Sequence, residues 1–211
     1  MIPFHDILVF AFAAFILVIS PGPNMIYLIS RSITQGKKAG LISLLGVACG
    51  FLFHILMVAY GLTALLFAVP LAYTALKVCG VGYLLYLAFQ AVRPNGTNVF
   101  AATRDLPADK PGKLFRIGLF TNVLNPKTAV FYMSLFPQFI HPEHGSVAAQ
   151  CLQLGFVQIA VSFSINFLII MSAARAARFF ARQPAWISVQ QWVMASVLTW
   201  LALKIAFSKA K

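Results

Sequence analysis

Residues 7–30 form the sequence ILVFAFAAFILVISPGPNMIYLIS, which carries no charged side chain. A helix needs about 20 consecutive apolar residues to cross a bilayer core of about 30 Å. The stretch is therefore long enough to span a membrane. The Pro-Gly-Pro at 21–23 predicts a break within it, because proline removes a backbone N–H and clashes with the preceding turn.

Further apolar stretches of sufficient length predict five more spans, at 41–69, 71–92, 114–140, 147–174 and 186–207. The composition agrees, because only 9% of the 211 residues are charged, whereas soluble domains carry about 25%. The sequence thus predicts an all-α integral membrane protein with six transmembrane helices. A five-span variant with one re-entrant run is the alternative, and it would move the C-terminal tail to the other side.

Most of the sixteen Lys and Arg residues lie in three alternate links, at 31–38, 93–116 and 175–182. Links rich in basic residues face the cytoplasm, so six spans would place both termini outside. This placement accounts for the net charge of +12 without a nucleic-acid partner, which we do not expect.

The one long polar stretch, around 94–112, separates two halves of three predicted spans each. An odd number of spans makes the halves run in opposite directions, which is an inverted repeat common among transporters. We therefore expect a single membrane transport domain over 1–211. It consists of a first three-helix repeat at 1–92, a cytoplasmic loop at 93–113 and a second repeat at 114–211.

The first and fourth spans are both predicted to be broken at Pro/Asn motifs. Asn24 and Asn125 are expected N-caps of the new half-helices, and Pro126 the first helical residue. Helix N-termini attract anions, and Lys127 would add a charge, so two such ends would hold the carboxylate of an amino acid. The predicted substrate-binding residues are Pro21, Gly22, Pro23, Asn24, Asn122, Asn125, Pro126 and Lys127. The alternatives are that the prolines only kink the helices and that Lys127 extends to the cytoplasmic interface.

Three further ionisable residues are candidates for proton or substrate contacts. His54 lies within the second span, Lys77 within the third and Asp6 just before the first. Each has a structural alternative: a hydrogen-bonded buried histidine, a lysine reaching the outer interface, and an acid stabilising the first turn of a helix. Acids deep in a span normally mark proton relays, and this sequence has none there, so the proton-carrying group stays open.

Other chemistry is not expected. The motif His141-x-x-His144 with Glu143 is the nearest approach to a metal or enzyme site, but it lies in a short loop without further ligands. We expect no metal, no cofactor and no enzymatic activity. The pair Gly46-x-x-x-Gly50 indicates close helix packing, within the molecule or in a homo-oligomer.

Several of these motifs resemble the lysine exporter (LysE/RhtB) family of bacterial amino-acid exporters. The similar stretches are Ser20-Pro21-Gly22-Pro23-Asn24, Gly36-Lys37-Lys38-Ala39-Gly40, Gly46-x-x-x-Gly50-x-x-x-His54, Lys77-x-x-Gly80-x-x-Tyr83-Leu84-x-Tyr86-Leu87, Phe120-x-Asn122-x-x-Asn125-Pro126-Lys127 and Phe136-Pro137-Gln138-Phe139. The resemblance implies a multi-pass protein of the bacterial cytoplasmic membrane. It also implies that the chain exports amino acids or close derivatives, driven by the proton motive force.

Among the substrates that the resemblance implies, the absence of a mid-span acid favours neutral amino acids, such as threonine, homoserine or leucine, over basic ones. Two alternatives remain: an exporter of another small solute, and a passive channel or membrane subunit.

Overall fold

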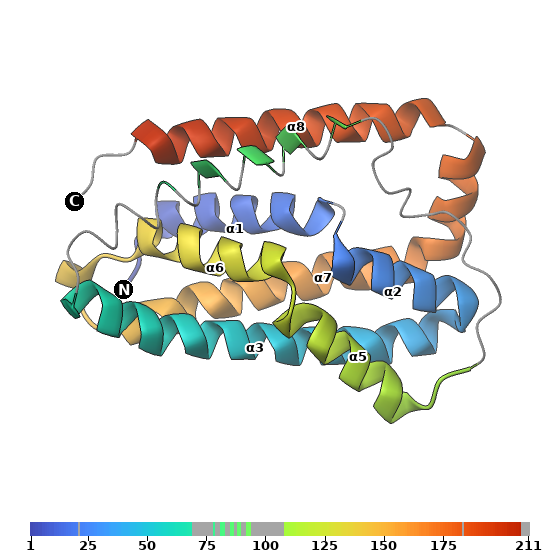
Figure 1. The fold of residues 1–211 in the computed structure, drawn as a ribbon, viewed down its shortest axis with the longest axis horizontal. Coiled ribbons are helices and arrows are strands. Elements are labelled where there is room, and N and C mark those ends of the chain that lie inside the picture. The colour runs from blue at the N-terminus through green and yellow to red at the C-terminus, as the bar shows by residue number, and fades with distance from the viewer. Residues whose placement is uncertain are drawn as a thin grey trace.

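A computed structural model (Figure 1) describes residues 1–20, 22–68, 108–182 and 184–207, with Val78 and the short stretches 81–82, 85–86, 88–89 and 92–93. The predictions for Pro21, Lys77, most of the span 71–92 and most of the loop 93–113 lie outside these residues, as does the tail after 207. The described residues form helices and no strand, which confirms the all-α prediction for them.

The helices follow one another with short links. They are α1 (Phe4–Ile19), α2 (Pro23–Thr34), α3 (Gly36–Ala68), α5 (Pro111–Val123), α6 (Pro126–Phe139), the 3₁₀ helix η1 (Pro142–His144), α7 (Val147–Arg182) and α8 (Pro184–Phe207). The predicted link at 175–182 is helical, as the C-terminal part of α7, and it lies beyond the apolar segment Val147–Ala173. The stretch is rich in Ala and Arg, which favour helix, and the helix ends shortly before Pro184.

Two helical segments, Gly36–Gly61 and Val147–Ala173, are long and apolar enough to cross a membrane. The α1–α2 pair is a third if it counts as one span bent by 56° at its break. The exposed side chains of α7 include Phe156, Phe163 and Phe167, as suits a helix that faces lipid. The chain is thus a multi-pass membrane protein, and the six-span repeat remains a prediction.

The helices run between two ends of the molecule (Figure 1). The turn between α2 and α3 and the start of α5 lie at one end, which we call the basic end because it carries Arg31, Lys37, Lys38 and Lys113. The N-terminus and the loop 140–146 lie at the other end, which we call the histidine end. The α1–α2 and α5–α6 pairs run in opposite directions between these ends, as an inverted repeat requires.

Glycines let α3 and α5 approach closely. A Cβ added at Gly46 would overlap the backbone oxygen of Phe115, and one at Gly118 would overlap that of Ser43. A Cβ at Gly50 would lie 2.6 Å from the Cβ of Asn122. Packing within the molecule is therefore the use of this glycine pair, as small residues at helix contacts predict.

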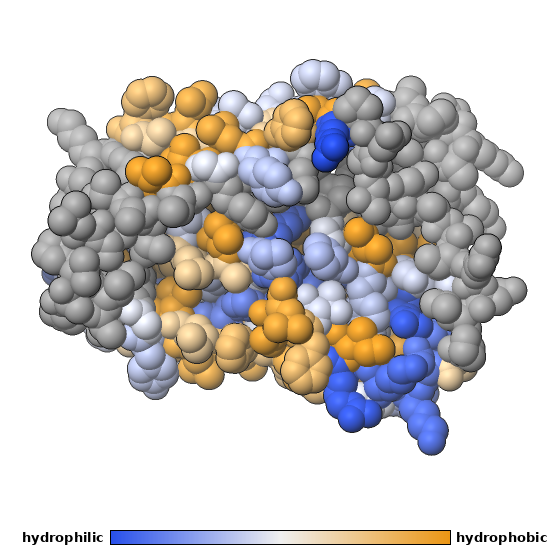
Figure 2. Space-filling model, viewed as in Figure 1, coloured by the Kyte–Doolittle hydropathy of each residue, from blue (hydrophilic) through white to orange (hydrophobic). Residues whose placement is uncertain are grey.

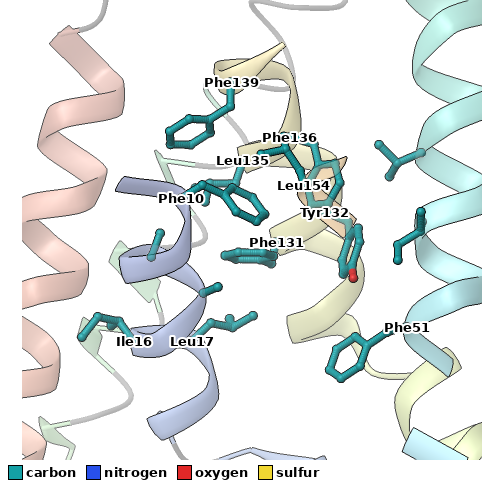
Figure 3. Packing of buried hydrophobic residues seen from close by; sticks show 14 of the residues in the cluster. Phe10, Ile16, Leu17, Phe51, Phe131, Tyr132, Leu135, Phe136, Phe139 and Leu154 are labelled. Carbon is teal, nitrogen blue, oxygen red and sulfur yellow. The ribbon is translucent and has the colours of Figure 1, made fainter. Parts of the chain in front are cut away.

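Aromatic rings fill the space between α1 and α6 on the side of the histidine end (Figure 3). Phe10 lies 5.3 Å from Phe136 and 5.5 Å from Phe139 between ring centroids, in edge-to-face contact. Tyr132 stacks on Phe136 at 4.5 Å. These rings are buried and form part of the core on this side of the molecule.

A charged cluster ties α2 to the start of α5 at the basic end. Asp109 lies 2.7 Å from Nη1 of Arg31 and 2.6 Å from Nζ of Lys113. Gln35 accepts from the Asp109 N–H at 2.9 Å and donates to its carboxylate at 3.3 Å. The Lys113 hydrogen bond, followed by those of Gln35 and by Arg31, lowers the pKa of Asp109.

This cluster predicts a pH-dependent stability. Replacing Asp109 by Asn is expected to lower the thermal unfolding midpoint of the purified protein at pH 7. Because the folded-state pKa of Asp109 lies below its usual value near 3.9, its stabilisation is present above that pH and is lost as the pH falls through the lowered pKa. The unfolding midpoints of wild type and D109N should therefore converge below about pH 4. A constant difference between pH 7 and pH 3 would contradict this.

Candidate functional site

The first helix break lies between Ile19 and Pro23. Gly22 is the N-cap of α2 and Pro23 its first residue, so the prediction that Asn24 is the cap is wrong. Proline is pre-organised for the first helical position, and this places the cap on the residue before it. Asn24 instead lies in the first turn of α2, where its side chain lines a cavity.

The second break lies between Val123 and Pro126, and here the prediction is confirmed. Asn125 is the N-cap of α6, its side-chain oxygen accepts from the backbone N–H of Lys127 at 3.0 Å, and Pro126 is the first helical residue. Asn125 is 3% exposed, so this cap is buried within the protein. A helix end placed there needs such a cap, because water cannot satisfy its N–H groups.

Lys127 connects the two breaks. Its Nζ donates to the backbone oxygen of Ser20 at 2.5 Å, across 107 residues of sequence. A Cβ added at Gly22 would lie 3.1 Å from Cδ and 3.3 Å from Nζ of Lys127, so glycine there leaves room for the lysine. Lys127 is 8% exposed, and thus it does not reach the cytoplasmic interface as the alternative required.

A small cavity of about 30 Å³ lies where the breaks meet α7. This space has room for only a few water molecules. Its polar lining combines one cation with amides and hydroxyl groups and carries no acid among the described residues. The polar residues of the lining are Ser20, Asn24, Asn125, Lys127, Thr128, Gln158 and Asn166.

A larger, widely open pocket of about 620 Å³ runs along α5 from the breaks toward the basic end, and the exposed Phe120 and Leu124 also line it. Pro23 and Asn125 form its inner part, and Lys113 and Arg116 belong to its lining nearer the basic end. Figure 2 shows hydrophilic residues gathered over this part of the molecule, at the lower right, where both cations are exposed. Asn125 lines both spaces, which brings the larger pocket next to the cavity.

Sequence reasoning missed the contribution of α7. Gln158, Ser162 and Asn166 are buried, and they face the bundle while phenylalanines face outward. The signal was available, because these polar residues recur at every fourth position of an apolar run and so share one helix face. Gln158 Nε2 donates to Ser162 Oγ at 3.0 Å, and Asn166 donates to the Ser162 backbone oxygen at 2.8 Å.

Asn122 and His54 lie together, away from the cavity lining. Asn122 donates to the backbone oxygen of Val47 at 2.9 Å, and its own backbone oxygen lies 3.1 Å from Nε2 of His54. His54 also stacks on Tyr132. The structural alternative for His54, a hydrogen-bonded buried histidine, therefore describes its surroundings. Pro126 is exposed and, like Asn122, does not line the cavity.

Asp6 lies at the histidine end, in the first turn of α1. It makes no capping hydrogen bond but lies 3.0 Å from Nε2 of His141, whose Nδ1 is 3.5 Å from Glu143. His141 lies in a loop, as expected from the sequence, and its side chain is buried. Within the described part of the chain, no group of His, Cys, Asp and Glu residues could hold a metal ion.

Apolar helices that enclose a polar, cationic cavity at two helix breaks are the arrangement of a membrane transport protein. The family model of the LysE type translocators matches residues 15–209, and the chain belongs to this family.

Individual proteins are also similar to the chain. The chain is 35% identical to the homoserine/homoserine lactone efflux proteins of Salmonella typhimurium and Salmonella typhi, over 71% of each chain. It is 28% identical to an uncharacterized membrane protein of Vibrio cholerae over 98% of each chain. No solved structure matches the chain.

Proposed function

We propose that the protein exports amino acids with an uncharged side chain from the cytoplasm across the bacterial inner membrane. Threonine, homoserine and leucine represent the class. Membership of the translocator family and the names of the two Salmonella relatives support export of such a solute. The proposed binding site is the cavity between the two helix breaks.

The observation that carries the proposal is Lys127. A buried cation is costly unless an anion or several hydrogen bonds compensate it, and among the described residues the Lys127 ammonium donates only to the backbone oxygen of Ser20. None of the described residues that line the cavity is an acid. The carboxylate of a bound amino acid would supply the missing anion, and the N-terminus of α6 adds its partial positive charge from the same side.

The two ends of the molecule fit a path from the cytoplasm outward. The pocket toward the basic end offers Lys113 and Arg116, which would attract a carboxylate. The buried aromatic rings of α1 and α6 lie on the side of the histidine end. Release would require these rings to separate, which is the alternating access expected of a transporter.

We propose coupling to the proton motive force, with protons as the driving ions. The described cavity lining offers Lys127 as its only ionisable side chain, whereas Asp6 and His54 lie elsewhere. Lys127 is thus the group of the described lining that can take up or release a proton.

Export from intact cells tests the proposal. Cells that lack their own exporters are fed dipeptides that release single amino acids inside, with and without this protein. We expect lower internal and higher external levels of neutral amino acids when the protein is present, and loss of this difference after an uncoupler. Export that persists with the uncoupler would indicate a passive channel. No effect on any amino acid, with the protein in the membrane, would contradict the proposal.

A further inference from the structure

Two amide oxygens at the central cavity have no hydrogen-bond partner among the described residues. They are Oδ1 of Asn24 in the first turn of α2 and Oε1 of Gln158 in the middle of α7. The Gln158 side chain is fully buried, and its Nε2 donates to Ser162 Oγ at 3.0 Å, while its Oε1 has no donor among the described residues. A buried acceptor without a donor is unfavourable, so the pair indicates a ligand that supplies donors.

The lining thus offers opposite chemistry on different elements. Lys127, from the start of α6, can only donate, whereas the two amide oxygens, from α2 and α7, can only accept. An amino acid carries the complementary groups on one carbon: a carboxylate that accepts and an ammonium with three donors.

We propose that Asn24 and Gln158 bind the ammonium group of the substrate while Lys127 binds its carboxylate. This inference rests on the proposed function and adds a requirement, namely that the substrate has a free amino group. It also makes Gln158 a residue that determines specificity, although it belongs to a helix that the sequence motifs do not mark.

The uncharged state of the two amides has a consequence for selectivity. They can satisfy one ammonium, but they cannot neutralise a second positive charge beside Lys127. The described lining contains no carboxylate for that purpose, and an unpaired charge in such a site is costly. Lysine and arginine should therefore bind more weakly than amino acids with neutral side chains.

The test compares three ligands on the purified protein: the amino acid selected by the export assay, its primary amide and its N-acetyl derivative. Threonine is the first choice. The amide keeps the ammonium and lacks the carboxylate, whereas the N-acetyl form keeps the carboxylate and lacks the ammonium. Binding is measured by titration calorimetry for wild type, Q158L and K127M.

We expect Q158L to bind the amino acid and its amide about tenfold or more weakly, because each loses a charge-assisted hydrogen bond. Its affinity for the N-acetyl form should stay unchanged, which also shows that the variant is folded. K127M should give the converse pattern and spare only the amide. Gln153→Leu is the matched control, because Gln153 lies on the same helix and accepts from the Ile2 N–H at the histidine end.

If Q158L bound all three ligands as tightly as the wild-type protein while K127M stayed impaired, this inference would be overturned and the proposed function would stand. Unchanged affinities in both variants would overturn both. If Q158L lost all three ligands equally, N24L would be measured in the same way. Equal loss in N24L as well would overturn the assignment of the ammonium group.

Discussion

Replacing Lys127 by methionine is expected to reduce export by about a hundredfold or more, while the protein stays folded. Methionine has a similar length, so it fills the space that the lysine stem occupies beside Gly22. It removes the only cation in the described cavity lining, and with it the partner of the substrate carboxylate. The effect is large because the pair would form away from water, where a missing charge partner costs about 2–5 kcal/mol.

Stability should move in the opposite direction to export. K127M removes a buried charge that has no acidic partner in the described lining, so its unfolding midpoint should equal or exceed that of wild type. Export from cells and thermal unfolding of the purified protein measure the two effects. K38M is the matched control, because Lys38 is exposed at the start of α3 and should be replaceable without loss of export. If K127M exported as well as wild type, Lys127 would not belong to the substrate site.

Replacing Gly46 by leucine is expected to prevent the protein from folding. A Cβ at this position already overlaps the Phe115 carbonyl, and further side-chain atoms would push α5 away from α3. Overpacking in a tight core costs about 1–3 kcal/mol, and more where the obstacle is backbone that cannot rotate aside. Displacing α5 would also break the hydrogen bonds of Asn122 to Val47 and His54.

Gly61 provides the control on the same helix, because a Cβ added there meets none of the described residues. Alanine variants at the two positions add a second comparison, because they should differ in the direction of their effect on stability. Alanine in a helix interior is about 0.5–1 kcal/mol more favourable than glycine, so G61A should be neutral or slightly stabilising. G46A should destabilise the protein despite that gain. For the variants at positions 46 and 61, the measurements are the recovery of monodisperse protein and its unfolding midpoint. A G46L protein that folds as well as wild type would contradict the described contact between α3 and α5.

The local features of the site were predictable because their chemistry is local. The Asn125 cap and the Pro126 start need only a favoured cap and a proline in sequence, and both were found. The same rule, applied to Pro23, would have placed the first cap on Gly22 rather than Asn24. Composition and the length of apolar runs likewise sufficed for an all-helical membrane protein.

The remaining features depend on contacts between distant parts of the chain. Ser20 and Lys127 are 107 residues apart, and nothing in either motif specifies that one accepts from the other. His141 lies in a loop as predicted, but nothing in the sequence specifies that Asp6, 135 residues away, pairs with it. Gln158 had a sequence signal in its four-residue spacing with Ser162 and Asn166, but only the tertiary packing places it at the cavity.

The most direct test of the central claim is an experimental structure of the protein with its exported amino acid bound. The account predicts that the cavity between the two helix breaks widens from about 30 Å³ to admit the ligand. The ligand carboxylate should then lie within hydrogen-bond distance of Lys127 Nζ, at about 2.7–2.9 Å. A ligand bound elsewhere, with Lys127 still donating to Ser20 and the cavity unchanged, would contradict it.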